Sequence, residues 1–562
     1  MQSRISLVVF VVLSCVVFLV SEEDRATAQV HDPRALEADP ASATEQIAPV
    51  LDGLGDYHMA VTTSSPRSQQ FFDQGLRLTY AFNHSEALRS FKEAARLDPK
   101  NAMAYWGWAL VLGPNLNLPM VPEVVSQAYE AVQQAVSKKQ GVSEREQDFI
   151  EALAKRYIDD PGADRVPLDR AYADAMRQLT KKYPDDPEAA TLYGASLMNL
   201  SPWNYWNKDG SPKGWTAEIV STFESVIERY PKHVGAHHYY IHVVEAVHPE
   251  LGVKSADSMT GLTPGAGHLV HMPSHIYMRV GRYADSFDAN LKASEADEHY
   301  ISSCRAQGMY PLTYYPHNVH FLVWAAMFQG KSEEAMAASR KIEGKIPSHL
   351  RGDTWGLFDS FLSQPLYTMV RFGKWDEILA EPKPAAESPF RTGVWHYARG
   401  LAFVHTSGRG ARRELNALRE IIDSAELEGQ LIGFSAAPKL LSIAAEIVAA
   451  EISAKKGKYL EASARLGRAV RLEDGLLYNE PPDWYFPVRH FLGAVLLEAG
   501  HPEEAEVVYW EDLRRAPENG YSLFGLKQAL TAQGRLEEAA EIDERFQKAW
   551  SAADVTLTSS RY

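Results

Sequence analysis

Beyond residue 50, the distribution of apolar and polar residues predicts a series of short helices joined by tight turns. The segment FFDQGLRLTYAFNHSEALRSFKEAARLDP shows one such unit. Small residues at Gly75 and Ala87 allow two antiparallel helices to approach closely, and Phe91 fills the space against the next unit. Pro99 ends the second helix because proline cannot continue it. An all-α protein built from helical hairpins is therefore expected.

The same pattern returns near the end of the chain. A turn glycine is followed five residues later by alanine at Gly457, Gly500 and Gly534, and the last two glycines are 34 residues apart. The pattern resembles the tetratricopeptide repeat (TPR) family, whose unit is a helix-turn-helix of about 34 residues. The resemblance implies a right-handed superhelical solenoid, with eight to ten units between about residues 68 and 550.

Three segments, AFNHSEALRSF, MAYWGWAL and GHLVHMPSHIYMR, are also similar to a group of exported bacterial TPR proteins of unsettled activity. This second resemblance implies a localisation and a fold, and it implies no reaction.

Two insertions interrupt the repeat period, and both are predicted to be long loops. Residues 201–216 carry Trp203, Trp206 and Trp215 among turn-forming residues, and residues 299–318 are rich in tyrosine. Long loops in compact arrays are often functional, although packing over the edge of a groove is the other interpretation.

The chain divides into six expected parts. They are a signal peptide (1–28), a linker (29–50), N-terminal TPR-like units (51–233), central histidine-rich TPR-like units (234–345), C-terminal TPR-like units (346–550) and a tail (551–562).

The N-terminus has the features of an export signal. Arg4 precedes an apolar run over residues 5–20, and ATAQ at residues 26–29 offers a cleavage site, which predicts a periplasmic or secreted protein. A lipoprotein anchored at Cys15 and an uncleaved membrane anchor are the alternatives. Cleavage would leave Cys304 alone, which excludes an internal disulfide and a thiolate-based zinc site.

The charge balance is acidic, with 57 Lys and Arg against 73 Asp and Glu. No block of basic residues occurs, so no nucleic-acid partner is expected.

Histidines recur at fixed distances from successive repeat turns. In GAGHLVHMPSHIYMRVGRY, His275 lies six residues, His271 ten and His268 thirteen residues before the turn glycine, Gly281. This repetition across neighbouring units predicts more than a chance accumulation of histidine.

The units on either side repeat these offsets. His242 lies six and His238 ten residues before the preceding turn at His248, and His320 lies ten residues before the following turn at Gly330. His490 has the same ten-residue offset from its own turn, but it is several units away and is expected only to line the groove.

Residues four apart on a helix share one face, so two histidine pairs on adjacent first helices can converge. The predicted metal ligands are His238, His242, His271 and His275, with His268 and His320 as additional candidates. Imidazoles without thiolates suit Zn, Cu, Fe or Ni. Glu245 shares the face of the first pair and is the candidate general base. Pro273 is expected to break the helix between His271 and His275.

Three interpretations of this cluster follow from the sequence. The first is an exported TPR protein with a metal site in its concave groove, which would make it a candidate metal-dependent hydrolase. The second is a metal-free scaffold whose groove binds a small molecule, a peptide or a partner protein. The third is a satisfied structural network. No nucleophile elbow, phosphate loop or zinc-protease motif occurs, so the sequence leaves open whether the protein is an enzyme.

Overall fold

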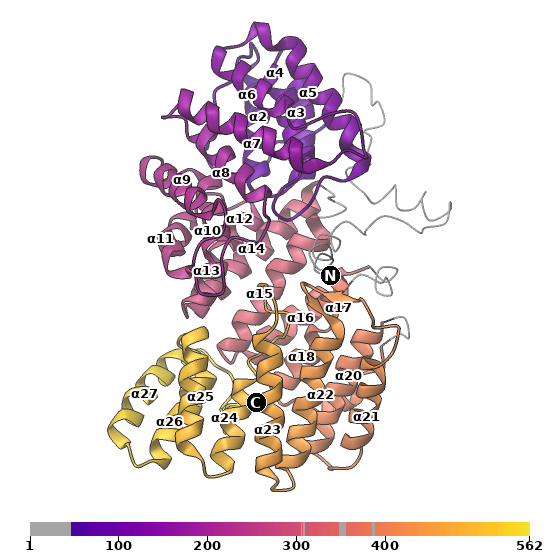
Figure 1. The fold of residues 1–562 in the computed structure, drawn as a ribbon, viewed down its shortest axis with the longest axis vertical. Coiled ribbons are helices and arrows are strands. Elements are labelled where there is room, and N and C mark those ends of the chain that lie inside the picture. The colour runs from indigo at the N-terminus through magenta and orange to yellow at the C-terminus, as the bar shows by residue number, and fades with distance from the viewer. Residues whose placement is uncertain (1–45, 305, 307–309, 348–355, 385–387) are drawn as a thin grey trace, which may run out of the picture. The chain divides into compact units, whose positions relative to one another are not determined.

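The computed structural model describes residues 46–304, 306, 310–347, 356–384 and 388–562. The predicted signal peptide, 1–28, and most of the predicted linker, 29–50, lie outside the described residues. Regular structure in the described residues is helical except for one short antiparallel pair, β1 (Leu431–Ile432) and β2 (Ser435–Ala436) (Figure 1). The expected all-α fold is confirmed.

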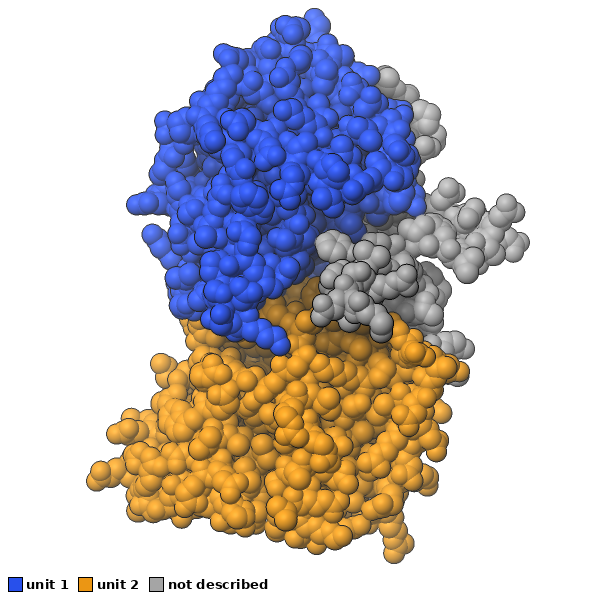
Figure 2. Space-filling model, in the orientation of Figure 1, with its two compact units in different colours: residues 1–276, 292–315 blue, residues 277–291, 316–562 orange. Residues whose placement is uncertain are grey.

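The chain forms two compact units (Figure 2). Unit 1 contains the described residues up to Ile276 together with Lys292–Tyr315, and unit 2 contains Tyr277–Leu291 together with the described residues from Pro316 onward. The chain passes between the units within three helices: α13 (Pro273–Arg279), α14 (Tyr283–Cys304) and α15 (Tyr315–Phe328).

The other helices belong to one unit each. Unit 1 contains α2 (Pro66–Tyr80), α3 (His84–Leu97), α4 (Ala102–Leu112), α5 (Val125–Lys138), α6 (Glu144–Ala154), α7 (Arg165–Lys182), α8 (Pro187–Asn199), α9 (Thr216–Arg229), α10 (Val234–Val244), α11 (Pro249–Met259) and α12 (Gly267–His271). It also has short 3₁₀ turns at Pro122–Val124 and Lys139–Gly141 and a π-helical turn at Tyr310–Tyr314.

Unit 2 contains α16 (Ser332–Lys345), α17 (Gly356–Leu362), α18 (Gln364–Arg371), α19 (Trp375–Ala380), α20 (Pro389–His405), α21 (Ala411–Ile422), α22 (Ala437–Ala454), α23 (Tyr459–Asp474), α24 (Arg489–Glu498), α25 (Pro502–Arg515), α26 (Gly520–Ala532) and α27 (Leu536–Ala549).

The repeat packing in unit 1 depends on an aromatic ring held between two glycines. Phe91 on α3 is fully buried, and a Cβ added at Gly75 on α2 or at Gly107 on α4 would lie 2.8 Å or 2.3 Å from its ring. Only glycine leaves room for the ring there, so one phenylalanine joins three successive helices. This confirms the role predicted for Phe91 and Gly75.

The same packing of an aromatic ring between two glycines occurs in unit 2. Tyr509 on α25 lies between Gly493 on α24 and Gly525 on α26, where an added Cβ would approach the tyrosine ring to 2.4 Å and 2.2 Å. Sixteen residues separate the aromatic residue from each glycine in both units. The turn residue Gly500 has φ of 78°, a left-handed conformation that favours glycine.

The two insertions behave differently. Residues 201–216 form the predicted loop between α8 and α9. An isolated antiparallel β-bridge pairs Trp206 with Pro212 within it. The prediction of a long loop at residues 299–318 is wrong for the described residues, because α14 continues to Cys304 and a π-helical turn leads into α15. Tyr310 and Tyr315 are buried there, and their burial holds the backbone in helical turns.

Within the described part of the chain, no helix is both long enough and apolar enough to cross a membrane.

Candidate metal centre in unit 1

Three short helical segments bring the histidines together. The helix α10 carries His238 and His242, and α12 carries His268 and His271. Pro273 begins α13, which carries His275, so the predicted helix break is confirmed. The break does not separate the pair, because Nε2 of His271 and Nε2 of His275 are 2.9 Å apart.

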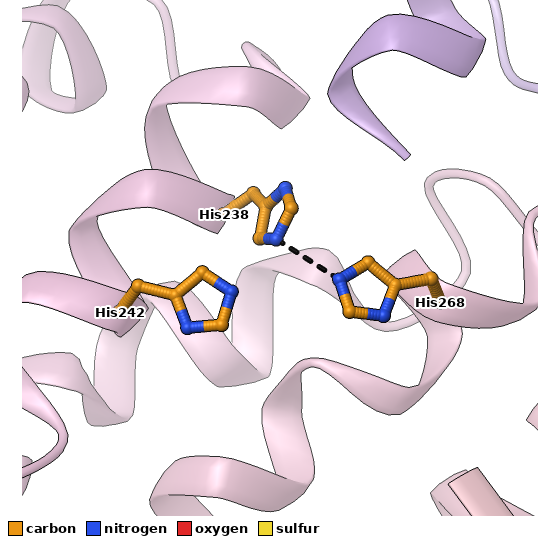
Figure 3. Close-up of side chains that lie close together, drawn as sticks. All are labelled: His238, His242 and His268. Atoms are coloured by element: carbon orange, nitrogen blue, oxygen red, sulfur yellow. Dashed lines mark hydrogen bonds between the residues drawn. The ribbon is translucent and has the colours of Figure 1, made fainter. Parts of the chain in front are cut away.

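The first pair of imidazoles joins α10 to α12. Nε2 of His238 lies 3.2 Å from Nε2 of His268, the contact drawn as a dashed line in Figure 3. Nδ1 of His238 lies 2.6 Å from the backbone carbonyl oxygen of Tyr80. A carbonyl only accepts hydrogen bonds, so Nδ1 carries the proton and Nε2 presents a lone pair. Burial lowers the pKa of His238 to about 3, which keeps this imidazole neutral.

The second pair has a carboxylate where the first has a carbonyl. Nδ1 of His275 lies 3.1 Å from Oε2 of Glu245, which follows α10 directly as its C-cap residue. This ion-pair contact lies on the Nδ1 side of His275, and the other ring nitrogen, Nε2, faces His271.

His242 lies between the two pairs. Its ring centroid is 4.8 Å from that of His238 and 5.3 Å from that of His275, and its Nδ1 is 3.4 Å from Oε2 of Glu245. Figure 3 shows the rings of His238, His242 and His268 gathered around a common space. Two groups of possible metal ligands share His242: His238, His242 and His268, and His242, Glu245 and His275.

These side chains are buried rather than exposed in an open groove. His238 and His271 are 0% exposed, and His242 and His275 are 3% exposed. The cluster therefore differs from the concave, solvent-lined surface that the sequence predicts. Any ion bound there would be largely shielded from solvent.

Several other buried or half-buried histidines in the described residues have a carboxylate close by. The pairs include His233 with Glu188 (3.4 Å), His396 with Glu414 (2.7 Å) and His490 with Asp512 (2.8 Å). In the unit 1 cluster, five histidines gather near one carboxylate, that of Glu245, which lies close to Nδ1 of His242 and His275. This nitrogen-rich composition is typical of a metal site.

Aromatic side chains enclose the cluster. The ring centroid of Phe82 lies 4.5 Å from that of His238, 5.4 Å from His268 and 6.0 Å from His242. Trp203, in the 201–216 loop, meets His242 edge-on at 5.3 Å. Phe82 has φ of 54° and Trp203 has φ of 60°, a strained conformation for residues other than glycine. Strained residues of this kind concentrate at functional sites.

The π-helical turn positions two tyrosines against His268. The backbone N–H of His268 donates to the Tyr310 hydroxyl at 3.1 Å, and that hydroxyl donates to Asp297 at 2.8 Å. The ring of Tyr314 meets the imidazole of His268 at 4.9 Å. Single π-helical turns often occur at functional sites.

The structure thus brings together most of the predicted site residues in unit 1. These are His238, His242, Glu245, His268, His271 and His275. The predicted ligand His320 belongs to unit 2, where its ring meets Phe361 at 5.8 Å and burial lowers its pKa to about 3. Its predicted role as a ligand stays a prediction.

Several contributors could not be selected from the sequence. Phe82 lies in the turn between α2 and α3, next to Asn83, which caps α3 by accepting from the backbone N–H of Glu86. The contact between Phe82 and the histidines joins residues more than 150 positions apart. The Tyr80 carbonyl is a backbone group, for which side-chain patterns give no signal.

Comparison with known proteins supports the repeat class. A family model described as tetratricopeptide repeat matches residues 487–509, which cover α24 and part of α25. The helical-hairpin fold and this match confirm the resemblance to TPR proteins. No curated protein matches the chain. The similarity to an exported bacterial group stays a prediction.

The solved structures that resemble this chain do so at low sequence identity and low TM-score. A human IFIT1 dimer with m7Gppp-AAAA is 13% identical, with a TM-score of 0.30 over 87% of this chain and 91% of that chain. Yeast Tom70 is 13% identical, with a TM-score of 0.32 over 86% of this chain and 99% of that chain. The TPR domain of P58(IPK) is 14% identical, with a TM-score of 0.19 over 65% of this chain and 93% of that chain. Likeness at this level carries no inference about what this chain binds.

Proposed function

We propose that this TPR-type protein binds a divalent transition metal ion in the histidine cluster of unit 1. The observation that carries the proposal is the 3.2 Å separation between Nε2 of His238 and Nε2 of His268. In a tetrahedral site with Zn–N bonds of about 2.0–2.1 Å, two ligand nitrogens lie about 3.3 Å apart. The two nitrogens are therefore spaced as neighbouring ligands of one ion, and the Tyr80 carbonyl orients one of them in advance.

The donor set defines the class of ion. Imidazole nitrogen suits Zn, Cu, Fe and Ni, whereas Mg and Ca prefer oxygen ligands. Among the residues that the structure describes, Cys304 is the free cysteine, and burial raises the pKa of its thiol to about 11. That thiol is poorly suited to act as a thiolate ligand.

Glu245 has a positioning role in this proposal. Its Oε2 faces Nδ1 of both His275 and His242, and it is 1% exposed. A carboxylate in this position orients imidazoles and makes them stronger ligands. The hydrolytic role expected of Glu245 stays a prediction, and these contacts favour positioning over general-base catalysis.

Metal content tests the proposal. The purified protein is stripped with a chelator, reloaded with Zn²⁺, desalted and analysed by elemental mass spectrometry. We expect bound zinc, and we expect the double substitution His238→Ala and His268→Ala to lower the affinity by at least 1,000-fold, since each ligand of a structural zinc site contributes about 3 kcal/mol.

The matched control is His237→Gln. His237 is buried on the same helix, but its nitrogens face Ser255 and the Pro231 carbonyl, outside the cluster. Its zinc content should equal that of the unsubstituted protein. Absence of metal in every sample after reconstitution would reject the proposal in favour of a metal-free scaffold that binds a peptide or partner protein.

A further inference from the structure

The histidine cluster contains two separate pairs of facing nitrogens. In one pair, Nε2 of His238 is 3.2 Å from Nε2 of His268, and in the other, Nε2 of His271 is 2.9 Å from Nε2 of His275. Each separation is close to the spacing of about 3.3 Å expected between two nitrogen ligands of one zinc ion. Each pair therefore has the dimensions of one edge of a metal site.

In both pairs, an oxygen lies beside Nδ1 of one imidazole. Nδ1 of His238 is hydrogen-bonded to the Tyr80 carbonyl at 2.6 Å, and Nδ1 of His275 lies at an ion-pair distance of 3.1 Å from the Glu245 carboxylate. The Tyr80 carbonyl fixes the tautomer that leaves the Nε2 lone pair of His238 facing His268.

His242 faces both pairs. Its Nδ1 is 3.4 Å from Oε2 of Glu245, on the side of the second pair. The other ring nitrogen, Nε2, is on the opposite side of the imidazole and is directed toward the space between His238 and His268 (Figure 3). His242 accordingly belongs to both groups of ligand atoms, each of which lies within 4.8 Å.

The number of donors also exceeds what one ion uses. Five histidines and one glutamate lie in this cluster, all of them buried. A structural zinc ion takes about four ligands, and a catalytic one takes about three from the protein. Two ions use these donors more completely than one ion does.

We infer that the cluster is a two-metal centre, with one ion held by His238, His242 and His268 and a second held by His271 and His275, whose Nδ1 faces the Glu245 carboxylate. His242 lies at the boundary between the two subsites. This inference rests on the proposed metal-binding function and adds a stoichiometry and an assignment of ligands to it.

Stoichiometry tests the inference with single substitutions. Metal-stripped protein is reloaded with Zn²⁺, desalted, and its zinc per chain is measured. We expect about two ions in the unsubstituted protein and in His237→Gln, and about one ion in both His268→Ala and His271→Ala, because each of these two variants disables one subsite.

Copper supplies an independent measurement. Two Cu²⁺ ions that share this cluster should couple magnetically, so the electron paramagnetic resonance spectrum should show less isolated-copper signal than the copper content predicts. His268→Ala and His271→Ala should each restore the spectrum of an isolated ion. Circular dichroism checks that both variants fold, and glutamine replaces alanine at either position where the alanine variant is unfolded.

The outcomes separate the inference from the function on which it rests. If the unsubstituted protein binds one zinc ion per chain and either substitution removes it, the two-metal centre is wrong and the metal-binding function still stands. Two ions that are both lost in each folded variant would overturn the division into separable subsites. No zinc in the unsubstituted protein would overturn both proposals.

Discussion

His238 in unit 1 and His490 in unit 2 occupy the same position in their repeats, ten residues before the turn. Both are completely buried. His490 meets Asp512 at 2.8 Å, whereas His238 meets a second histidine at 3.2 Å. The repeat thus determines where a buried histidine lies, and the residue opposite determines what it can do.

The surroundings of Asp512 show how unit 2 uses this position for stability. The carboxylate also accepts from the Ser522 hydroxyl at 2.7 Å and from the Asn519 amide at 3.1 Å. Burial alone would raise the pKa of Asp512, but His490 and Ser522 outweigh burial and lower it. The result is a buried hydrogen-bond network centred on the Asp512 carboxylate.

The strongest test of the comparison replaces the unit 2 histidine. His490→Ala removes a donor from a buried carboxylate and leaves a cavity, so we expect it to lower the free energy of unfolding by about 3 kcal/mol. Zinc content should stay unchanged. Urea denaturation and elemental analysis measure both quantities, and a loss of zinc from folded His490→Ala would show that the two positions are not functionally distinct.

A smaller effect is expected at the carboxylate of the unit 1 cluster. Glu245→Ala removes the carboxylate beside Nδ1 of His275, which should weaken metal binding by about 10- to 100-fold. Glu245→Gln keeps an acceptor oxygen and should weaken it less. Competition with a chromophoric chelator measures both affinities, and equal affinity in all three proteins would exclude the positioning role of Glu245.

The aromatic ring packed between two glycines should make both units equally sensitive to a larger residue at the glycine positions. A methyl group at Gly107 would press against Phe91, and one at Gly525 would press against Tyr509. Overpacking of this kind should lower the free energy of unfolding by about 2 kcal/mol in each variant. Thermal unfolding measures the change, and an effect in only one unit would argue against equivalent packing.

The smallest expected effect is that of pH on the free energy of unfolding. Burial lowers the pKa of His84 in unit 1 to about 4 and that of His320 in unit 2 to about 3. Below a pH of about 6.5, these histidines take up protons in the unfolded chain but stay neutral in the folded chain. The free energy of unfolding therefore falls as the pH falls. The slope for each histidine is at most about 1.4 kcal/mol per pH unit.

Substitution isolates the contribution of one histidine. We expect metal-free His84→Gln to lose less stability between pH 6.5 and pH 4.5 than the unsubstituted protein, because it removes one of these titrating groups. Urea denaturation across this range measures the difference. A parallel pH profile would contradict the assigned pKa shift of His84.

The sequence predicted the fold through residues whose role is local. Gly75 and Phe91 reveal a helical hairpin because the packing of neighbouring helices depends on their size and spacing. The offsets of His238 and His271 from their turns were equally visible, since a repeated unit places equal offsets on equivalent helices.

The completed site depends on contacts that spacing does not encode. The Tyr80 carbonyl and the Phe82 ring reach the histidines from a turn far away in the sequence. The burial of the cluster follows from these aromatic neighbours and from Trp203, so the histidines are buried rather than exposed in the groove that repeat geometry predicts. Pro273 was correctly identified as a helix break, but the close approach of His271 and His275 across it required the structure.

The central claim is that imidazole nitrogens in unit 1 bind a transition metal directly. X-ray absorption spectroscopy of the zinc-loaded protein tests it most directly. We predict a first shell dominated by nitrogen at about 2.0–2.1 Å, with the multiple-scattering pattern of histidine rings, and its loss in the His238→Ala and His268→Ala double variant. A shell of oxygen ligands alone, or an unchanged spectrum in that variant, would contradict the account.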